Sequence, residues 1–247
     1  MRLPDAFLRR PLAHRGLHDR AGGVIENSLS AFDAAIAGGY GIELDVQISA
    51  DGVPVVFHDA TLDRVTAATG PVNARTARDL RSIALAGSDD RILPLRDVLD
   101  HVAGRVPVLV EIKDQTGRGD GPALDQAVGH VLRDAGVLVA VMSFNPAYIA
   151  ALDWLRDVPR GITSGSADDY PSDLPDATRR SLARLEMFER SGANFLSHNH
   201  TDLQNTRVRA LKSAGAHVLC WTIRSQAEAD AALRVAENIT FEGFTPA

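Results

Sequence analysis

The sequence predicts an α/β fold, a closed parallel (β/α)8 barrel of the TIM type, and three observations indicate it. Apolar runs of strand length alternate with amphipathic helical patterns, and eight such runs remain once one hairpin strand is set aside. The chain has 247 residues, a usual length for one barrel. Charged residues end several of the apolar runs, where a parallel barrel gathers its chemistry. We therefore expect residues 1–247 to form one domain.

A doubly wound open sheet is the alternative architecture. It is disfavoured because HRGLHDRAGG, which follows the first apolar run, lacks the glycine spacing of a dinucleotide-binding turn. The last helix of a regular barrel is missing after the final strand pattern. We expect residues 1–10, with Phe7 and Leu8, to cover one end of the barrel.

The first strand is expected at 11–16, and a helical pattern follows it. Asn27 or Ser28 can cap this helix, because both side chains accept hydrogen bonds from a first helical turn. Apolar residues between 29 and 36 fall on one helical face, and Gly38 with its neighbour ends the helix. These features predict a β-to-α unit.

The second strand is expected at 41–49, where alternation puts Glu43, Asp45 and Gln47 on one face. Residues 50–52 form a turn that leads at once into VPVVFHD. Since a parallel crossover needs about a dozen residues, so short a turn predicts an antiparallel hairpin. The hairpin opens an insertion of approximately 48–92, which includes a short helix near 77–83.

Regular alternation resumes at Pro94, which suits the first position of a helix. Helices are expected at 95–103, 122–135, 146–156, 177–191, 202–214 and 225–236. Strands are expected at 105–113, 137–144, 161–164, 194–198, 217–223 and 239–244.

Composition narrows the function. The net charge of −6 argues against general nucleic-acid affinity, which needs a basic face. No stretch reaches the roughly 18 apolar residues of a membrane span, and the first residues lack the apolar core of a secretory signal. Cys220 is the single cysteine and reads as a small buried hydrophobe. We expect a cytoplasmic protein with no stable membrane association.

Polar residues from three separate strands are expected to meet at the barrel mouth. They are His14 with Arg15, Glu43 with Asp45, and Glu111 with Lys113, and the hairpin can add His58. Three clustered carboxylates would repel one another without a cation, and their hard oxygens suit Mg²⁺ or Ca²⁺ better than Zn²⁺. The alternative is that Glu43 and Asp45 only form ion pairs with Arg15 and Lys113.

The basic residues of this group suit an anionic substrate. The guanidinium of Arg15 can bind two phosphate oxygens, and Lys113 adds a second cation. His14 and His58 can supply a general acid and a general base. By contrast, His198 and His200 could form a metal-binding pair, but loop polarity or substrate contact is favoured because no further His or Cys accompanies them.

Seven short motifs together resemble the glycerophosphodiester phosphodiesterase family, within the wider barrels similar to phosphatidylinositol-specific phospholipase C. The motifs are AHRG (13–16), EN (26–27), ELD (43–45), DGVPVVFHDATLDR (51–64), EIK (111–113), SF (143–144) and WT (221–222). HRG or EIK alone would be weak, whereas the ordered set spans nearly the whole chain and is highly specific.

The resemblance implies a barrel with a small insertion and a role for each site residue. It implies Glu43, Asp45 and Glu111 as ligands of a divalent cation, His14 and His58 as the acid-base pair, Arg15 and Lys113 as phosphate-binding residues, and Glu26 and Asn27 as supporting residues. The implied reaction converts small-molecule glycerophosphodiesters to glycerol 3-phosphate and an alcohol. Its implied route is attack by the glycerol hydroxyl on phosphorus, followed by hydrolysis of the cyclic phosphate.

The chain departs from the family pattern at its end, where ITFEGFTPA replaces a D-G-I-x-T-D-x-P type of segment. Ile25 and Ser28 also replace the usual Pro and Thr beside the EN motif. We interpret the departure at the end of the chain as affecting substrate contacts near the last strand rather than catalytic positions. Two alternatives remain: a related phosphodiesterase acting on lysophospholipids, and a catalytically silent barrel that binds a phosphorylated ligand.

Overall fold

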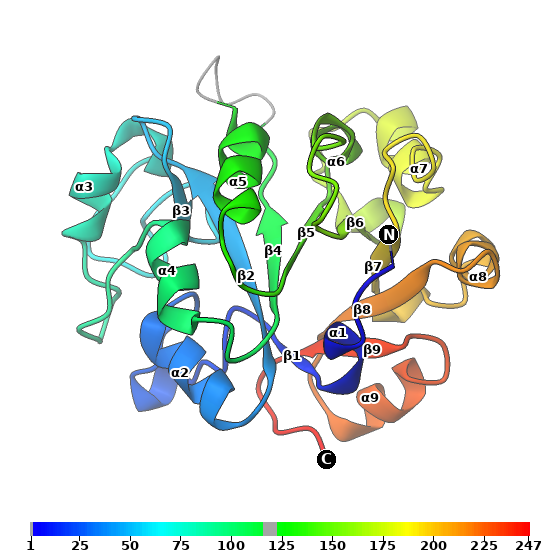
Figure 1. Ribbon diagram of the computed structural model, residues 1–247, viewed down its shortest axis with the longest axis horizontal. Coiled ribbons are helices and arrows are strands. Elements are labelled where there is room, and N and C mark those ends of the chain that lie inside the picture. The colour runs from blue at the N-terminus through cyan, green and yellow to red at the C-terminus, as the bar shows by residue number, and fades with distance from the viewer. Residues whose placement is uncertain (1, 116–122) are drawn as a thin grey trace.

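Parallel strands close into a barrel that helices surround (Figure 1). The computed structural model describes residues 2–115 and 123–247. The barrel strands are β1 (Leu12–Ala13), β2 (Gly41–Ile48), β4 (Val108–Ile112), β5 (Val139–Ser143), β6 (Arg160–Ser164), β7 (Phe195–Asn199), β8 (His217–Ile223) and β9 (Asn238–Phe241). Each pairs in parallel with its neighbour in this order, and β1 pairs with both β2 and β9. The predicted closed barrel is confirmed, and the open sheet is wrong.

The closing strand is short, yet it joins the two ends of the sheet. Leu12 of β1 pairs with Gly41 of β2 on one side and with Thr240 of β9 on the other. The central strands are buried along nearly their whole length, which is why they read as continuous apolar runs in the sequence.

The N-terminal segment covers the end of the barrel where the strands begin. Its helix α1 (Ala6–Arg9) buries Phe7 completely, and Leu8 packs against the same apolar cluster. The side chain of Asn238, the first residue of β9, donates hydrogen bonds to the carbonyls of Phe7 and Arg10 at 2.7 and 2.6 Å. The expectation is confirmed for the described residues 2–10, and the opposite end of the barrel is left for a site.

Most helices lie where the sequence predicts them but are shorter. They are α2 (Leu29–Ala37), α4 (Leu95–Val102), α5 (Leu124–Arg133), α6 (Pro146–Ala151), α7 (Asp176–Ala183), α8 (Thr206–Ser213) and α9 (Gln226–Ala232). The predicted start of α5, at 122, falls outside the described residues. Helix α7 ends early because Leu185 adopts a left-handed φ of 54°, which a helix cannot continue through.

The structure shows which residues stand at the cap positions of α2 and α4. Ser28, rather than Asn27, caps α2, because its hydroxyl accepts a hydrogen bond from the backbone of Ala31 at 3.1 Å. Pro94 stands at the cap position of α4, one residue before the helix, and not at the first helical position that the sequence suggested. Its φ of −56° suits either place, so the sequence pattern alone did not separate them.

The predicted hairpin is present. Strand β3 (Pro54–Val56) pairs antiparallel with β2, with Val46 opposite Val56. The chain then leaves the barrel through α3 (Ala77–Arg81) before it reaches α4, and this segment has its own apolar cluster around Val55, Phe57 and Leu80. The backbone of Phe57 also donates to the carbonyl of Asp45 at 3.0 Å, which fixes the chain just before His58 at the barrel mouth.

No helix in the described part of the chain is long and apolar enough to cross a bilayer.

Candidate metal and phosphate site

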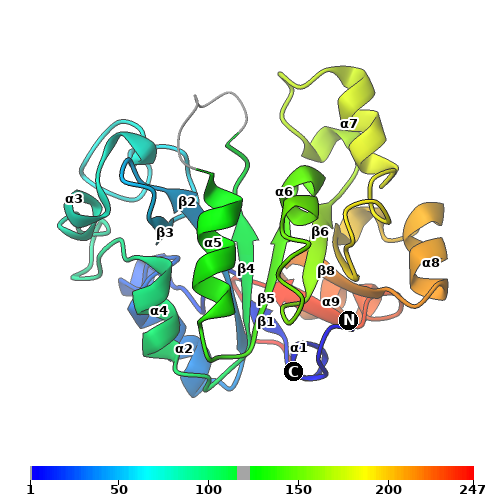
Figure 2. The ribbon, with the colours of Figure 1, turned by 45° about the horizontal axis from the view of Figure 1, so that its top comes forward.

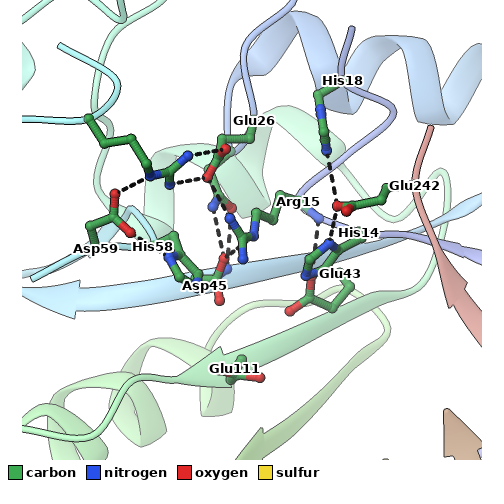
Figure 3. A network of polar contacts seen from close by, with 12 residues as sticks. His14, Arg15, His18, Glu26, Glu43, Asp45, His58, Asp59, Glu111 and Glu242 are labelled. Carbon is green, nitrogen blue, oxygen red and sulfur yellow. Dashed lines mark hydrogen bonds and ion pairs between the residues drawn. The ribbon is translucent and has the colours of Figure 1, made fainter. Parts of the chain in front are cut away.

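Three carboxylates meet at the ends of β2 and β4. Glu43 and Asp45 project from the same face of β2, and Asp45 lies opposite Glu111 in the parallel register of the two strands. All three side chains are buried, and one oxygen from each lies within 4.8 Å of the others (Figure 3). This is the predicted group of hard oxygen ligands.

The three acids have unequal electrostatic surroundings. Burial, together with the charges of Asp45 and Glu111, raises the pKa of Glu43 well above its usual range. Burial acts in the same direction on Asp45, but the positive charges of Lys113, His58 and Arg15 outweigh it and lower the pKa of Asp45. A cation bound beside Glu43 would offset the repulsion from Asp45 and Glu111 that raises the pKa of Glu43.

Lys113 and Arg15 flank the carboxylates. The Nζ atom of Lys113 lies 2.7 Å from Glu111 and 3.4 Å from Asp45, while Nε of Arg15 lies 3.4 Å from Asp45. Asp45 therefore forms the ion pairs of the alternative interpretation, whereas Glu43 accepts a hydrogen bond from the backbone amide of Arg15. With all three carboxylates ionised, as metal ligands must be, three carboxylates and two cations leave one net negative charge. A divalent cation would reverse that charge to one positive, which suits a phosphodiester monoanion.

The backbone that presents Arg15 is held in an unusual conformation. Arg15 and Asn27 have left-handed φ values of 57° and 56°. Hydrogen bonds compensate: the amide of Arg15 donates to Glu43 at 3.1 Å, and the amide of Asn27 donates to the carbonyl of Arg15 at 2.8 Å. Asn27 Nδ2 also donates to Asp45 at 2.9 Å. Strained backbone that its surroundings hold this firmly is characteristic of functional sites.

Gly16 completes the AHRG turn because no larger residue fits there. Its φ is 80°, and a Cβ at this position would approach the Cβ of Ala31 in α2 to 2.8 Å. The glycine therefore lets the turn that carries His14 and Arg15 pack directly on α2.

Glu26 links the turn to the insertion. Its carboxylate accepts hydrogen bonds from Arg15 at 2.8 Å and from Arg64 at 2.6 and 2.7 Å, and Arg64 also donates to Asp59 (Figure 3). Burial alone would raise the pKa of Glu26, but the hydrogen bonds from Arg64 and the charge of Arg15 lower it to about 2. Glu26 thus stays ionised and holds Arg15 in place.

The two histidines are each oriented by a carboxylate. Nδ1 of His58 lies 2.7 Å from Oδ1 of Asp59, and Nδ1 of His14 lies 2.6 Å from Oε2 of Glu242. Pairing through Nδ1 leaves Nε2 of each ring as the nitrogen that can face a ligand. Burial lowers the pKa of His58, against the opposing charge of Asp45.

Glu242 is the residue that the sequence analysis missed. It follows β9 directly, in the ITFEGFTPA segment whose departure we interpreted as affecting substrate contacts rather than catalytic positions, and it contacts His14, a predicted catalytic residue. His18 Nε2 lies 3.6 Å from its carboxylate and Arg224 lies 2.6 Å from it. Hydrogen bonds from His14 and His18 lower the pKa of Glu242. The sequence signal that could have found Glu242 is the one that identified Glu111, a charged residue at the end of a strand pattern.

These groups enclose a cavity of about 220 Å³. It is lined by all the predicted metal, histidine and phosphate-binding residues, namely His14, Arg15, Glu43, Asp45, His58, Glu111 and Lys113. Phe144 and Trp221 form an aromatic wall, with ring centroids 5.5 Å apart. The cavity is small for a drug-sized ligand and suits a compact phosphorylated one.

His198 and Cys220 are structural residues. The ring of His198 is fully buried between the hydroxyl of Ser164 at 2.8 Å and Asp202 at 3.1 Å. Within residues 2–115 and 123–247, the acids and histidines that lie close enough together to hold a metal ion are Glu43, Asp45 and Glu111. Neither His198 nor His200 belongs to this group. Cys220 is buried, which raises the pKa of its thiol to about 12.

The model of the glycerophosphoryl diester phosphodiesterase family matches residues 14–238. The chain belongs to this family. The putative glycerophosphodiester phosphodiesterase YhdW of Bacillus subtilis is 30% identical over 229 residues, which cover 87% of this chain and 86% of that protein. The match to bovine glycerophosphodiester phosphodiesterase 1 is 43% identical but covers only 29% of this chain and 21% of that protein.

Solved structures share the barrel of the glycerophosphodiester phosphodiesterase family. A phosphodiesterase of Oleispira antarctica, in complex with the product sn-glycerol-3-phosphate, matches with a TM-score of 0.75 and 22% identity over 96% of this chain and 94% of its own. A putative family member from Silicibacter pomeroyi matches with a TM-score of 0.76 and 23% identity over 94% and 89%. At these identities the structures establish the fold.

Proposed function

We propose that this chain hydrolyses glycerophosphodiesters to glycerol 3-phosphate and an alcohol, with a divalent cation and two histidines. The observation that carries the proposal is the convergence of three buried carboxylates, two cations and His14 and His58 on one small cavity. Membership of the family supports the reaction class. The product-bound relative from Oleispira antarctica supports glycerol 3-phosphate as the retained half of the substrate.

Glu43, Asp45 and Glu111 would hold the cation. Their oxygens are close enough to share one ion, their side chains are buried, and oxygen ligands suit Mg²⁺ or Ca²⁺. The bound cation would stabilise negative charge on phosphoryl oxygens during the reaction.

Arg15 and Lys113 would hold the phosphate from the other side. Both are already oriented by carboxylates, Arg15 by Glu26 and Lys113 by Glu111. Preorganised donors lose little conformational entropy when the substrate binds, and they stabilise the charge that develops on the phosphoryl group. Asn27 supports the site through its hydrogen bonds with Asp45.

His14 and His58 would move the protons. One ring takes the proton of the attacking glycerol hydroxyl as the oxygen bonds to phosphorus, and the other gives a proton to the departing alcohol oxygen. A water then opens the cyclic phosphate, with the roles of the two rings exchanged. Asp59 and Glu242 keep each ring in a fixed orientation through Nδ1.

The direct test is an assay of glycerol 3-phosphate release from glycerophosphocholine, glycerophosphoethanolamine and glycerophosphoglycerol, with Mg²⁺ or Ca²⁺ present. We expect turnover of at least one diester that stops when the metal is chelated. Saturable binding of glycerophosphocholine in a calorimeter without any product would show a silent binding barrel and contradict the proposal. The cytoplasmic location and the lack of nucleic-acid binding stay predictions from the sequence.

A further inference from the structure

A second and larger cavity adjoins the site. It measures about 510 Å³, and it shares Glu111, Lys113 and Phe144 with the cavity that holds the carboxylates. The two spaces are therefore neighbours across the end of β4. A ligand whose phosphate sits beside Lys113 has room to extend into the larger cavity.

The larger cavity has an apolar wall that the protein itself leaves uncovered. Helix α7 stands beyond the strand ends on the side of the mouth (Figure 2) and has no buried residue. Leu174, just before this helix, and Thr178 and Leu182 on one face of it line the cavity. Helix α7 is otherwise mostly polar, so the apolar side chains that this segment adds to the lining are Leu174 and Leu182.

The acidic residues of the cavity are engaged within the protein. Oδ2 of Asp169 accepts hydrogen bonds from the amide and hydroxyl of Ser166 at 2.7 and 2.9 Å, and Oδ1 accepts one from Asn199 at 2.7 Å. Asp114 accepts one from Asn145 at 3.2 Å. These carboxylates fix loops, so the lining favours an apolar ligand group over a cationic alcohol.

We propose that the larger cavity binds an alkyl or acyl chain carried by the substrate. The preferred substrates are then glycerophosphodiesters with an apolar chain, either on the leaving alcohol or on the glycerol as in a lysophospholipid. This inference rests on the proposed function, because the phosphate and glycerol occupy the smaller cavity. A space of about 510 Å³ lies in the range that buries most of a ligand of drug size.

The chain-length dependence of turnover measures this binding. Each buried methylene contributes about 0.8 kcal/mol, which corresponds to about fourfold in kcat/KM. One arm uses sn-glycero-3-phosphoalkanols from ethyl to octyl, with the chain on the leaving alcohol. The other uses lysophosphatidylcholines with butanoyl to octanoyl chains, below their micelle concentrations. We expect kcat/KM to rise about fourfold per methylene in one arm, which identifies the alcohol that carries the chain.

Variants in and beside α7 test whether the dependence of kcat/KM on chain length arises in the larger cavity. Leu174→Gln and Leu182→Gln make the wall polar, and we expect each to lower the octyl-to-ethyl ratio of kcat/KM about tenfold, since part of a leucine contact is lost. Thr178→Leu adds apolar surface at an exposed position and should raise the ratio. Leu233→Gln is the matched control: Leu233 is 47% exposed, does not line the cavity, and its variant should keep the wild-type ratio.

A binding measurement separates this inference from the proposed function. Calorimetry with ethyl, butyl, hexyl and octyl phosphate needs no turnover, and we expect the dissociation constant to fall along the series in the wild type and less steeply in Leu182→Gln. Turnover of glycerophosphocholine with flat chain-length profiles in both arms would overturn the cavity assignment alone. A slope that the α7 variants leave unchanged would overturn it too. Absence of turnover with every diester would overturn the proposed function, and the calorimetric series then decides the cavity.

Discussion

The barrel mouth has two contiguous sides that offer a ligand different chemistry. The acidic side consists of the ends of β9, β1, β2 and β4, and it carries the three carboxylates, both oriented histidines and the strained backbone of Arg15. The apolar side consists of the ends of β5 to β8 with α7, and it offers Phe144, Trp221 and the larger cavity. Under the proposed function, the acidic side would perform the reaction and the apolar side would select the substrate.

The two sides also differ in how firmly their residues are held. Arg15, Asp45 and Glu26 are each fixed by two or more polar contacts, and their elements pack around the barrel. Helix α7 buries none of its residues. Local opening needs less free energy where few apolar contacts are lost, so the apolar side can adapt to different ligands while the acidic side keeps its geometry.

Metal removal should have the largest effect, and it acts on the acidic side alone. We expect chelation to lower kcat by at least about 10³-fold, because a bound cation supplies several kcal/mol of charge stabilisation to a phosphoryl group. Adding Mg²⁺ or Ca²⁺ back should restore turnover. Glu111→Gln should weaken that restoration, measured as the metal concentration for half-maximal activity. Full activity of metal-stripped protein would contradict the cation assignment.

Loss of either histidine at the barrel mouth, His14 or His58, should come next. We expect His14→Ala and His58→Ala each to lower kcat by about 10² to 10⁴, the range for a general acid or base. His101→Ala is the matched control, because His101 pairs with Asp33 on the surface, away from the mouth. A histidine whose alanine variant turns over at the control rate has no part in proton transfer.

Glu242 should have a smaller but measurable effect as a positioning residue. Glu242→Gln removes the charge from the hydrogen bond to His14, and a charge-assisted bond contributes about 1.5 to 3 kcal/mol, or about 10- to 100-fold in kcat with little change in KM. Glu242→Asp should recover part of the rate. Glu189→Gln, which alters an exposed pair with Arg207, serves as the control. Equal loss in kcat and stability, with no recovery in the Asp variant, would indicate a merely structural role.

Acid stability should give the smallest effect. Because folding lowers the pKa of Glu26 from 4.5 to about 2, the ionised carboxylate stabilises the fold above about pH 5, and that stability is lost as the pH falls toward 2. The contribution is about 3 kcal/mol at most. We expect urea unfolding to show Glu26→Gln less stable than the wild type at pH 7 and the difference to shrink toward pH 3. A constant difference would contradict this role.

The acidic side could be predicted from sequence because its geometry follows from strand periodicity. Alternation along β2 puts Glu43 and Asp45 on one face, and the short connection to β3, residues 49–53, permits only a hairpin. Glu242 was missed because nothing local shows that residues near both ends of the chain meet. That contact depends on barrel closure, which pairs β1 with β9.

The apolar side was less predictable. Helix α7 arises from DATRRSLA, in which few residues are apolar, and its cavity depends on how loops from three different strands pack. Helix α7 ends early because Leu185 has a left-handed φ, a conformation that leucine rarely adopts. No sequence pattern indicates this conformation. Periodicity describes faces of single elements, so it cannot report the space between them.

The two-residue strand β1 has a consequence for synthesis of the protein. It bridges β2 and β9, and His14 and Glu242 are 228 positions apart, so the contact between them cannot form until β9 has left the ribosome. Contacts between distant residues also form slowly during folding. The acids of β2 and β4 can come together earlier, whereas His14 is oriented only once the barrel has closed. The nascent chain is therefore expected to acquire its metal ligands before its activity.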